Sequence, residues 1–271
     1  MASRDASQIE LRLEFAVHIA RQAGLHTLTK FRAAGLEVQR KSDGSPVTDA
    51  DREAEQLLRQ LIQDRFPDDA ILGEEFGDSA GNSRFRWVLD PIDGTKSFVS
   101  GVPLYATLVA VLHDDTPAIG VIFAPAVDEM IYASTDQGCW HVVGKSEPQR
   151  AQVSRVSTLA EALFVTTSVK AFSTDRTLDC HTVFDQLQKS CRLTRTWGDA
   201  FGYLLVATGR AEVMIDPKLS LWDAAALAPV IEEAGGKFCD WQGRATVHSG
   251  EALATNAALA EEVLAILRAR E

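Results

Sequence analysis

Cysteine is scarce in this chain, and long apolar runs are missing. Its 271 residues include only four cysteines, none of them in a CxxC pair, which argues against a zinc site or a disulfide framework. We interpret Cys139, Cys180, Cys191 and Cys239 as reduced, buried thiols. No run approaches the roughly 18 apolar residues of a membrane span, and the first fifteen residues lack the apolar core of a signal peptide. We therefore expect a cytoplasmic protein without membrane association.

Positive charge is also in short supply. The sequence has 27 lysines and arginines against 38 aspartates and glutamates, which gives a formal net charge of -11. Such a surface repels nucleic acid and anionic membranes, so we expect neither as a partner. A small anion can bind only where the local field is positive. The contents of 46% hydrophobic and 24% charged residues are ordinary for a soluble globular protein.

The first half of the chain combines helical patterns with strand patterns. Apolar residues recur at helical spacing over residues 7–33 and again over residues 49–65, which predicts two amphipathic helices. From about residue 69, short apolar or alternating segments follow one another between turn-forming residues. These segments predict a sheet of several strands, largely antiparallel, and they read AILGEE, RWVLD, YATLVAVL, AIGVIFA and EMIYAS.

A polar stretch, GKSEPQRAQ, separates this half from a second half in which strand and helix patterns alternate. We expect an N-terminal α+β half over residues 1–145 and a C-terminal α/β half over residues 146–271. Within the second half, the pair Gly235 and Gly236 predicts the end of a helix, and Asn256 predicts the N-cap of the last helix.

Two aspartates flank Pro91 and Ile92 in the segment DPIDGT, directly after a run of apolar residues. The proline forces Asp90 into an extended conformation, which predicts that Asp90 ends a strand and that Asp93 lies in the following turn. Both side chains can then face one point. Two carboxylates at the end of a buried strand are costly unless a positive group lies between them.

Further acidic residues stand at the ends of predicted elements. Glu74 and Glu75 end a short strand, and Asp223 begins a helix in the segment LWDAAAL. Oxygen ligands alone favour Mg²⁺ or Mn²⁺ over zinc, which prefers histidine or cysteine. Each residue also has an ordinary explanation: Asp93 as a turn residue before Gly94, Asp223 as a helix cap, and the two glutamates as a solvated strand end.

Taken together, the segments GEE, DPIDGT, WDAAA and EAGG resemble the signatures of the inositol monophosphatase superfamily of metal-dependent phosphomonoesterases. The resemblance extends from Lys41 to the C-terminal helix. It implies an α/β fold of mixed α+β character, an alternating α-β-α-β-α layered sandwich with the active site between its two halves. It also implies two or three Mg²⁺ ions, with Mn²⁺ as an alternative, and a homodimer.

The resemblance further assigns roles to individual residues. Thr95 would hold the attacking water beside the metal bound by Glu74, and Asp51 would ligate a third, weaker metal. Thr48 and Asp51 also fit a capping box at a helix start. Lys41 would lie near the active site, unless it is a solvated charge. The implied metal ligands are Glu74, Asp90, the carbonyl of Ile92, Asp93 and Asp223, of which Asp223 would also contact the substrate.

The sequence offers two more clues about phosphate binding. The N–H groups of Gly94 and Thr95 stand at a predicted helix start and would grip the phosphate, because glycine allows a close approach. A phosphate monoester resists attack through its own negative charge, and metal ions neutralise that charge. We assign no role to Lys96.

Three segments are most similar to histidinol-phosphate phosphatases of histidine biosynthesis. They are GVPLYATL in the first half and WGDAFGYLLVATGRAEVMIDP and WQG in the second half. Asp199 and Asp216 match positions that contact the organic part of the substrate, and histidinol phosphate carries an ammonium and an imidazole. Carboxylates also accept hydrogen bonds from hydroxyls, so inositol 1-phosphate or another small sugar or nucleotide phosphomonoester stays an alternative. Asp199 could instead cap the helix 200–209, and Asp216 could start a turn before Pro217.

A different class of function is a regulatory relative that binds partners and has lost catalysis. Loss of a key site residue would favour it, and all are present: Glu74, Asp90, Asp93, Thr95 and Asp223. Keeping several carboxylates together without a metal is costly, so the sequence favours the enzyme.

Overall fold

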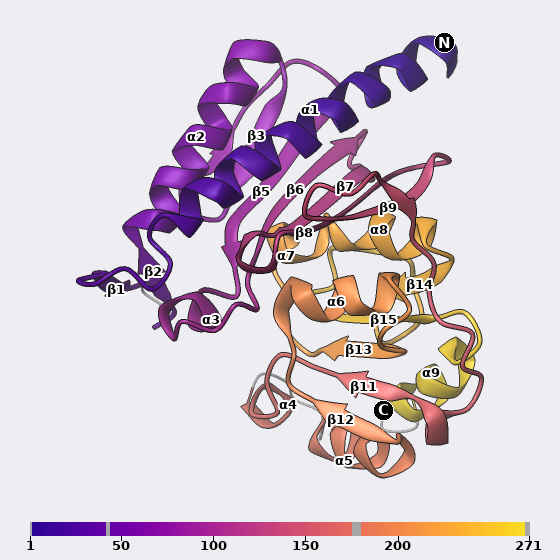
Figure 1. Cartoon of the computed structure of the whole chain (residues 1–271). Coiled ribbons are helices and arrows are strands. Elements are labelled where there is room, and N and C mark those ends of the chain that lie inside the picture. The colour runs from indigo at the N-terminus through magenta and orange to yellow at the C-terminus, as the bar shows by residue number, and fades with distance from the viewer. Residues whose placement is uncertain (1, 42–43, 175–179, 269–271) are drawn as a thin grey trace.

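The computed structural model describes residues 2–41, 44–174 and 180–268, and it is built of alternating helical and sheet layers (Figure 1). The outer helices of the first layer are α1 (Ala2–Leu28) and α2 (Asp49–Arg65). Helix α2 has the predicted bounds. Helix α1 ends before the predicted residue 33, because Phe31 leaves the helical path to pack against Phe98 and Tyr105, with ring centroids 5.6 and 5.1 Å apart.

The first sheet has eight strands in the order β10-β9-β8-β7-β6-β5-β3-β4. All neighbours are antiparallel except β3 and β5, in agreement with the predicted largely antiparallel sheet. The strands are β3 (Ala70–Gly73), β4 (Gly77–Ser79), β5 (Phe85–Asp93), β6 (Ala106–His113), β7 (Thr116–Ala124), β8 (Glu129–Ser134), β9 (Gly138–Val143) and β10 (Gln149–Arg150). The sequence pattern does not reveal the edge strands β4 and β10 or their neighbour β9, because β4 and β10 are short and β9 is only partly buried.

A helical layer from the second half covers the other face of this sheet and separates it from a five-stranded sheet of order β12-β11-β13-β15-β14 (Figure 1). The middle helices are α6 (Asp199–Ala207), α7 (Leu221–Ala224) and α8 (Leu227–Glu233). The strands are β11 (Leu163–Val165), β12 (Leu193–Arg195), β13 (Val213–Asp216), β14 (Gly236–Cys239) and β15 (Ala252–Asn256). Helices α5 (Cys180–Ser190) and α9 (Ala260–Arg268), with the short α4 (Ala171–Thr174), form the last layer.

Smaller elements complete the fold. They are the hairpin of β1 (Val38–Arg40) and β2 (Pro46–Thr48), helix α3 (Thr95–Val99), and the 3₁₀ turns η1 (Pro125–Val127) and η2 (Leu159–Glu161). Within the described ranges, no helix combines the length and the apolar character that crossing a membrane requires. All four cysteines are buried, as predicted.

Helix boundaries in the second half follow from proline and glycine. Residues 221–233 form two helices, α7 and α8, because Pro229 has no N–H to donate to the carbonyl of Ala225. Gly235 ends α8 in a left-handed conformation with φ 84°, as predicted. The side-chain oxygen of Asn256 accepts a hydrogen bond of 3.1 Å from Leu259 N just before α9, which is the predicted capping contact.

Candidate active site

The DPIDGT segment lies at the end of β5, in the middle of the first sheet. Strand β5 continues to Asp93, and its pairing with β6 is interrupted by a bulge between Asp90 and Asp93. The prediction that the strand ends at Asp90 is therefore wrong. A bulge changes the side on which the following side chains point. Here it accompanies two buried carboxylates, with Asp90 1% and Asp93 9% exposed.

Asp223 reaches the same place from the second half of the chain. It stands in the first turn of α7, where Ser220 is the N-cap and Asp223 Oδ2 accepts a hydrogen bond of 2.7 Å from Ser220 N. One carboxylate oxygen from each of Asp90, Asp93 and Asp223 lies within 4.8 Å of the others. The capping role and the cluster are thus compatible, since the cap uses one of the two oxygens.

The electrostatics of this carboxylate cluster (Asp90, Asp93 and Asp223) fit a divalent cation. Burial raises the pKa of Asp90 and of Asp93 well above the ordinary value, and neighbouring carboxylates raise both further. Burial likewise raises the pKa of Asp223 to about 7. Buried like charges of this kind are stable when a cation neutralises them, and oxygen donors in this number are those of Mg²⁺.

Glu74, in the turn between β3 and β4, interacts with Asp90 of the cluster. Its side chain is within hydrogen-bond distance of Asp90, and its charge raises the pKa of Asp90. Lys41 Nζ lies 2.7 Å from Glu74 Oε1 and 2.7 Å from Glu75 Oε1. Burial alone would lower the pKa of Lys41, but its hydrogen bonds to the two glutamates outweigh burial and raise this pKa. Lys41 is thus an ion-pair partner of the site and not a solvated charge.

Thr95 lies beside the cluster at the first residue of α3. Its hydroxyl is 3.1 Å from the carbonyl oxygen of Ile92 and 3.4 Å from Asp51 Oδ1. The other oxygen of Asp51 accepts hydrogen bonds from the N–H and the hydroxyl of Thr48, at 2.8 and 2.6 Å, which is the predicted capping box. Asp51 therefore both caps α2 and faces Thr95. Gly94, which directly precedes Thr95, has φ 84°, a conformation that favours glycine.

Asp199 faces the cluster from α6. An ideal Cβ at Gly94 would lie 2.9 Å from Asp199 Oδ2, and the neighbouring N–H of Ala200 donates to Asp93 Oδ2. Burial raises the pKa of Asp199 to about 7, and the charges of Asp216 and Asp223 add to the shift. The N-cap position of α6 is occupied by Gly198, so Asp199 is the first helical residue, and its backbone has φ 52°. Helix capping therefore does not explain this aspartate.

Asp216 is held in the interior at the end of β13. One of its oxygens accepts hydrogen bonds from Thr167 N at 3.0 Å and Thr166 Oγ1 at 3.4 Å. The other accepts from Thr167 Oγ1 at 3.0 Å and Tyr203 Oη at 3.2 Å. Thr167 Oγ1 in turn accepts the N–H of Asp199 at 2.8 Å. The structure thus links Asp216 to Asp199 through Thr167.

A cavity of about 140 Å³ lies beside the carboxylate cluster, and Asp93, Asp199 and Asp223 all line it. Its lining is Asp93, Thr167, Asp199, Ala200, Tyr203, Lys218, Leu219, Asp223 and Leu227. Of these residues, Thr167, Tyr203 and Lys218 were not among the predicted site residues. Thr167 could have been found as a polar residue directly after the apolar strand LFV, whereas nothing in the local pattern distinguishes Lys218 from a surface lysine.

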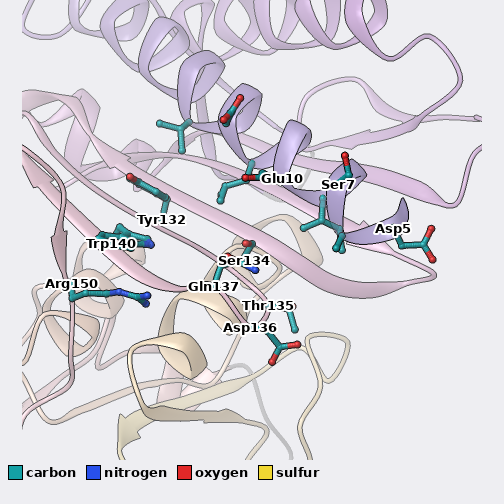
Figure 2. Close-up of a pocket in the computed structure, with 15 residues that line it drawn as sticks. Asp5, Ser7, Glu10, Tyr132, Ser134, Thr135, Asp136, Gln137, Trp140 and Arg150 are labelled. Carbon is teal, nitrogen blue, oxygen red and sulfur yellow. The ribbon is translucent and has the colours of Figure 1, made fainter. Parts of the chain in front are cut away.

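A larger cavity, of about 980 Å³, lies away from this chemistry, between helix α1 and strands β8 and β9 (Figure 2). Tyr132, Trp140 and Arg150 line it from the sheet, and Glu10 lines it from α1 (Figure 2). None of the carboxylate cluster lines it. Size alone therefore does not identify the active site, and the smaller cavity is the candidate.

The raised pKa values predict how pH affects the metal-free protein. An unfolded aspartate has a pKa of about 3.9, whereas those of Asp199 and Asp223 are about 7 in the folded chain. Between these values the folded state binds more protons, so the free energy of unfolding falls as pH rises. We expect the Tm in EDTA to fall by about 5 °C or more from pH 5 to pH 8.

Mg²⁺ competes with those protons, so the rise in Tm that it causes should grow with pH. Differential scanning fluorimetry with and without Mg²⁺ at each pH measures both effects. A Mg²⁺-induced rise that is the same at pH 5 and pH 8 would contradict the assignment of these carboxylates to one metal site.

Comparison with known proteins agrees with this geometry. The Inositol monophosphatase family matches residues 8–271. The histidinol-phosphatase of Chlorobaculum parvum is 40% identical over 256 residues, which cover 94% of this chain and 96% of that protein. The histidinol-phosphatase of Streptomyces coelicolor is 39% identical over 262 residues, covering 95% and 97%. A solved inositol monophosphatase from Zymomonas mobilis superimposes with a TM-score of 0.82 at 33% identity, covering 95% and 98% of the two chains. The predicted layered α/β fold is confirmed.

Proposed function

Because the chain belongs to the inositol monophosphatase family, we propose that this phosphatase is Mg²⁺-dependent and that its substrate is histidinol phosphate. The observation that carries the first part is the buried cluster of Asp90, Asp93 and Asp223. The second part is supported by Asp199, which lines the adjacent cavity, and by the names of the relatives with about 40% identity.

The proposed site residues have three roles: metal binding, orientation of the attacking water and phosphate binding. The carboxylate cluster and Glu74 would hold Mg²⁺, which when bound neutralises the phosphate and makes water a better nucleophile. Thr95 can donate its hydroxyl proton to the carbonyl of Ile92 or to Asp51, so its oxygen is free to accept a hydrogen bond from the attacking water and to orient it. The N–H groups of Gly94 and Thr95 would bind a phosphate oxygen.

Asp199 would recognise the cationic part of the substrate. Its carboxylate is close to the DPIDGT segment, so it can face an ammonium or imidazolium group while the phosphate lies at the cluster. Asp216 would contribute indirectly, since both of its oxygens already accept hydrogen bonds and one of its donors, Thr167, holds the N–H of Asp199. The homodimer, the cytoplasmic location and the division at residue 145 stay predictions.

A phosphate-release panel tests the proposal. The substrates are histidinol phosphate, inositol 1-phosphate, 3'-phosphoadenosine 5'-phosphate and fructose 1,6-bisphosphate, each with and without Mg²⁺. We expect the highest kcat/KM for histidinol phosphate and no turnover in EDTA. Preference for another member of the panel would leave the phosphatase but reject the substrate, and absence of turnover on all four would favour the non-catalytic regulatory relative.

Replacing Asp199 by asparagine should discriminate between substrates. We expect Asp199→Asn to lower kcat/KM for histidinol phosphate by about 10- to 100-fold, the value of a charge-assisted hydrogen bond of roughly 1.5–3 kcal/mol. Inositol 1-phosphate has no cation, so its kcat/KM should change less. The control is Asp64→Asn on the exposed face of α2, which should change neither. Equal losses for both substrates would mean general damage to the cavity.

A further inference from the structure

Glu55 of helix α2 lies outside the carboxylate cluster, yet it contacts the turn that carries Glu74. We propose that Glu55 is a positioning residue that sets the metal affinity of the site by fixing the turn 74–76. The inference rests on the proposed metal-dependent function and extends it to a residue that touches neither the cluster nor the cavity.

The contacts of Glu55 are unusual for a helix glutamate. Its side chain is fully buried, at 0% exposure. Glu55 Oε2 accepts a hydrogen bond of 2.7 Å from Glu75 N, and Glu55 Oε1 accepts one of 3.2 Å from Phe76 N. A buried carboxylate that accepts two consecutive backbone N–H groups fixes the path of that backbone. The turn between β3 and β4 is therefore held from inside the protein.

Arg59, one helical turn further along α2, completes this clamp. Its Nε donates a hydrogen bond of 2.8 Å to Glu55 Oε1, so the buried negative charge of Glu55 is balanced by the positive charge of Arg59. The same guanidinium donates to Ser79 Oγ at 2.9 Å and to the carbonyl of Gly77. Strand β4 is thus tied to α2 as well. Gly73 on the near side has no room for a side chain, because a Cβ there would overlap Glu55 Oε1.

Glu74 is placed by these neighbours. Its N–H donates to the carbonyl of Leu89 at 3.2 Å, and the next two N–H groups along the chain donate to Glu55. Its carboxylate contacts two different groups. One is Asp90 of the cluster, and the other is the ammonium of Lys41, which lies 2.7 Å from Glu74 Oε1. A loosened turn would let Glu74 follow Lys41, whose side chain is 24% exposed, away from the cluster.

The size of the effect follows from other metal sites. Residues that orient a metal ligand typically change metal affinity by about 10- to 100-fold when they are mutated. A purely structural role of Glu55 makes a different prediction: the variant would be less stable, with an unchanged affinity for metal. Direct metal titration therefore separates the two roles, and it does so without substrate.

The test compares Glu55→Gln with Glu53→Gln, its matched control. Glutamine at position 55 presents an amide N–H₂ to backbone or guanidinium N–H donors, so the turn loses an acceptor. Glu53 is on the same helix, with its side chain 41% exposed, and pairs with Lys30 and His26 away from the turn. Metal-free protein is titrated with Mn²⁺, and the electron paramagnetic resonance signal of free Mn²⁺ reports binding.

We expect Glu55→Gln to weaken Mn²⁺ binding by about tenfold or more. In Glu53→Gln the affinity for Mn²⁺ should change by less than about twofold, as expected for a substitution on the surface. At saturating Mg²⁺ the kcat of Glu55→Gln should return to within about threefold of wild type, because the chemistry uses other residues. Unchanged Mn²⁺ affinity in Glu55→Gln overturns the inference, whereas a wild-type protein that binds no Mn²⁺ overturns the proposed function itself.

Should Glu55→Gln fail to fold by circular dichroism, Gly73→Ala makes the same test from the opposite side. The added methyl group would displace the Glu55 carboxylate from Glu75 N and Phe76 N while leaving every charge in place. A loss of Mn²⁺ affinity of about tenfold again supports the positioning role. Wild-type affinity in this variant rejects it.

Discussion

Asp93→Asn is expected to lower kcat by about 10³-fold or more, equivalent to roughly 4 kcal/mol of transition-state stabilisation. Asp93 is one of the three clustered carboxylates, and replacing it with an amide removes a charge but little volume. A metal held by fewer charged ligands neutralises the phosphate less well. Phosphate release at saturating Mg²⁺ measures the effect.

The same variant should keep its fold, which distinguishes loss of a ligand from general damage. The pKa of Asp93 is raised by burial and by the charges of Asp199 and Asp223, so removing its charge relieves repulsion in the metal-free protein. The amide oxygen can still accept the N–H of Ala200. We expect the Tm in EDTA to be equal to that of wild type or higher. A rate close to wild type would remove Asp93 from the metal site.

Thr95→Ala is expected to lower kcat by about 10²- to 10⁴-fold with little change in KM. The hydroxyl of Thr95 lies between the carbonyl of Ile92 and Asp51, and it contributes by orienting the attacking water. That contribution is larger in the transition state than in the bound ground state, so it affects kcat. Steady-state phosphate release gives both constants.

Thr95→Ser is the matched control for this prediction. It keeps the hydroxyl and removes only a methyl group, so its kcat should stay within about tenfold of wild type. A Thr95→Ala variant with raised KM and normal kcat would instead make Thr95 a phosphate-binding residue with no part in the chemical step.

Much of the fold could be predicted from the sequence, because local patterns control local structure. Helix α2 has its predicted bounds, since its apolar period, the Thr48 cap and Asp51 act within a few residues of one another. The main strands of the first sheet were predicted from their apolar runs. The bulge in β5 was not, because it depends on how β6 pairs with Asp90 and Asp93.

The sequence by itself also determined the chemical character of the candidate site. Acidic residues without histidine or cysteine, in the segments GEE, DPIDGT and WDAAA, indicate a hard divalent cation. The resemblance of these segments to the inositol monophosphatase superfamily implies a phosphate monoester as substrate. These residue types stay the same whatever the fold, so they can be interpreted before it is known. The family resemblance also implied that Asp90, Asp93 and Asp223 share a metal site. What the sequence does not give is how close these carboxylates lie, how deeply they are buried and which other side chains hold them.

The tertiary structure decided those questions, because they depend on residues far apart in the chain. It brings Asp223 of α7 to within 4.8 Å of Asp90 and Asp93 of β5, and it places Asp51 of the α2 capping box beside Thr95. It also links Asp216 to Asp199 through Thr167, and Glu55 to the turn 74–76. The contacts of Asp223, Asp199 and Glu55 join separate elements of the packed layers, so the local sequence pattern does not determine their geometry.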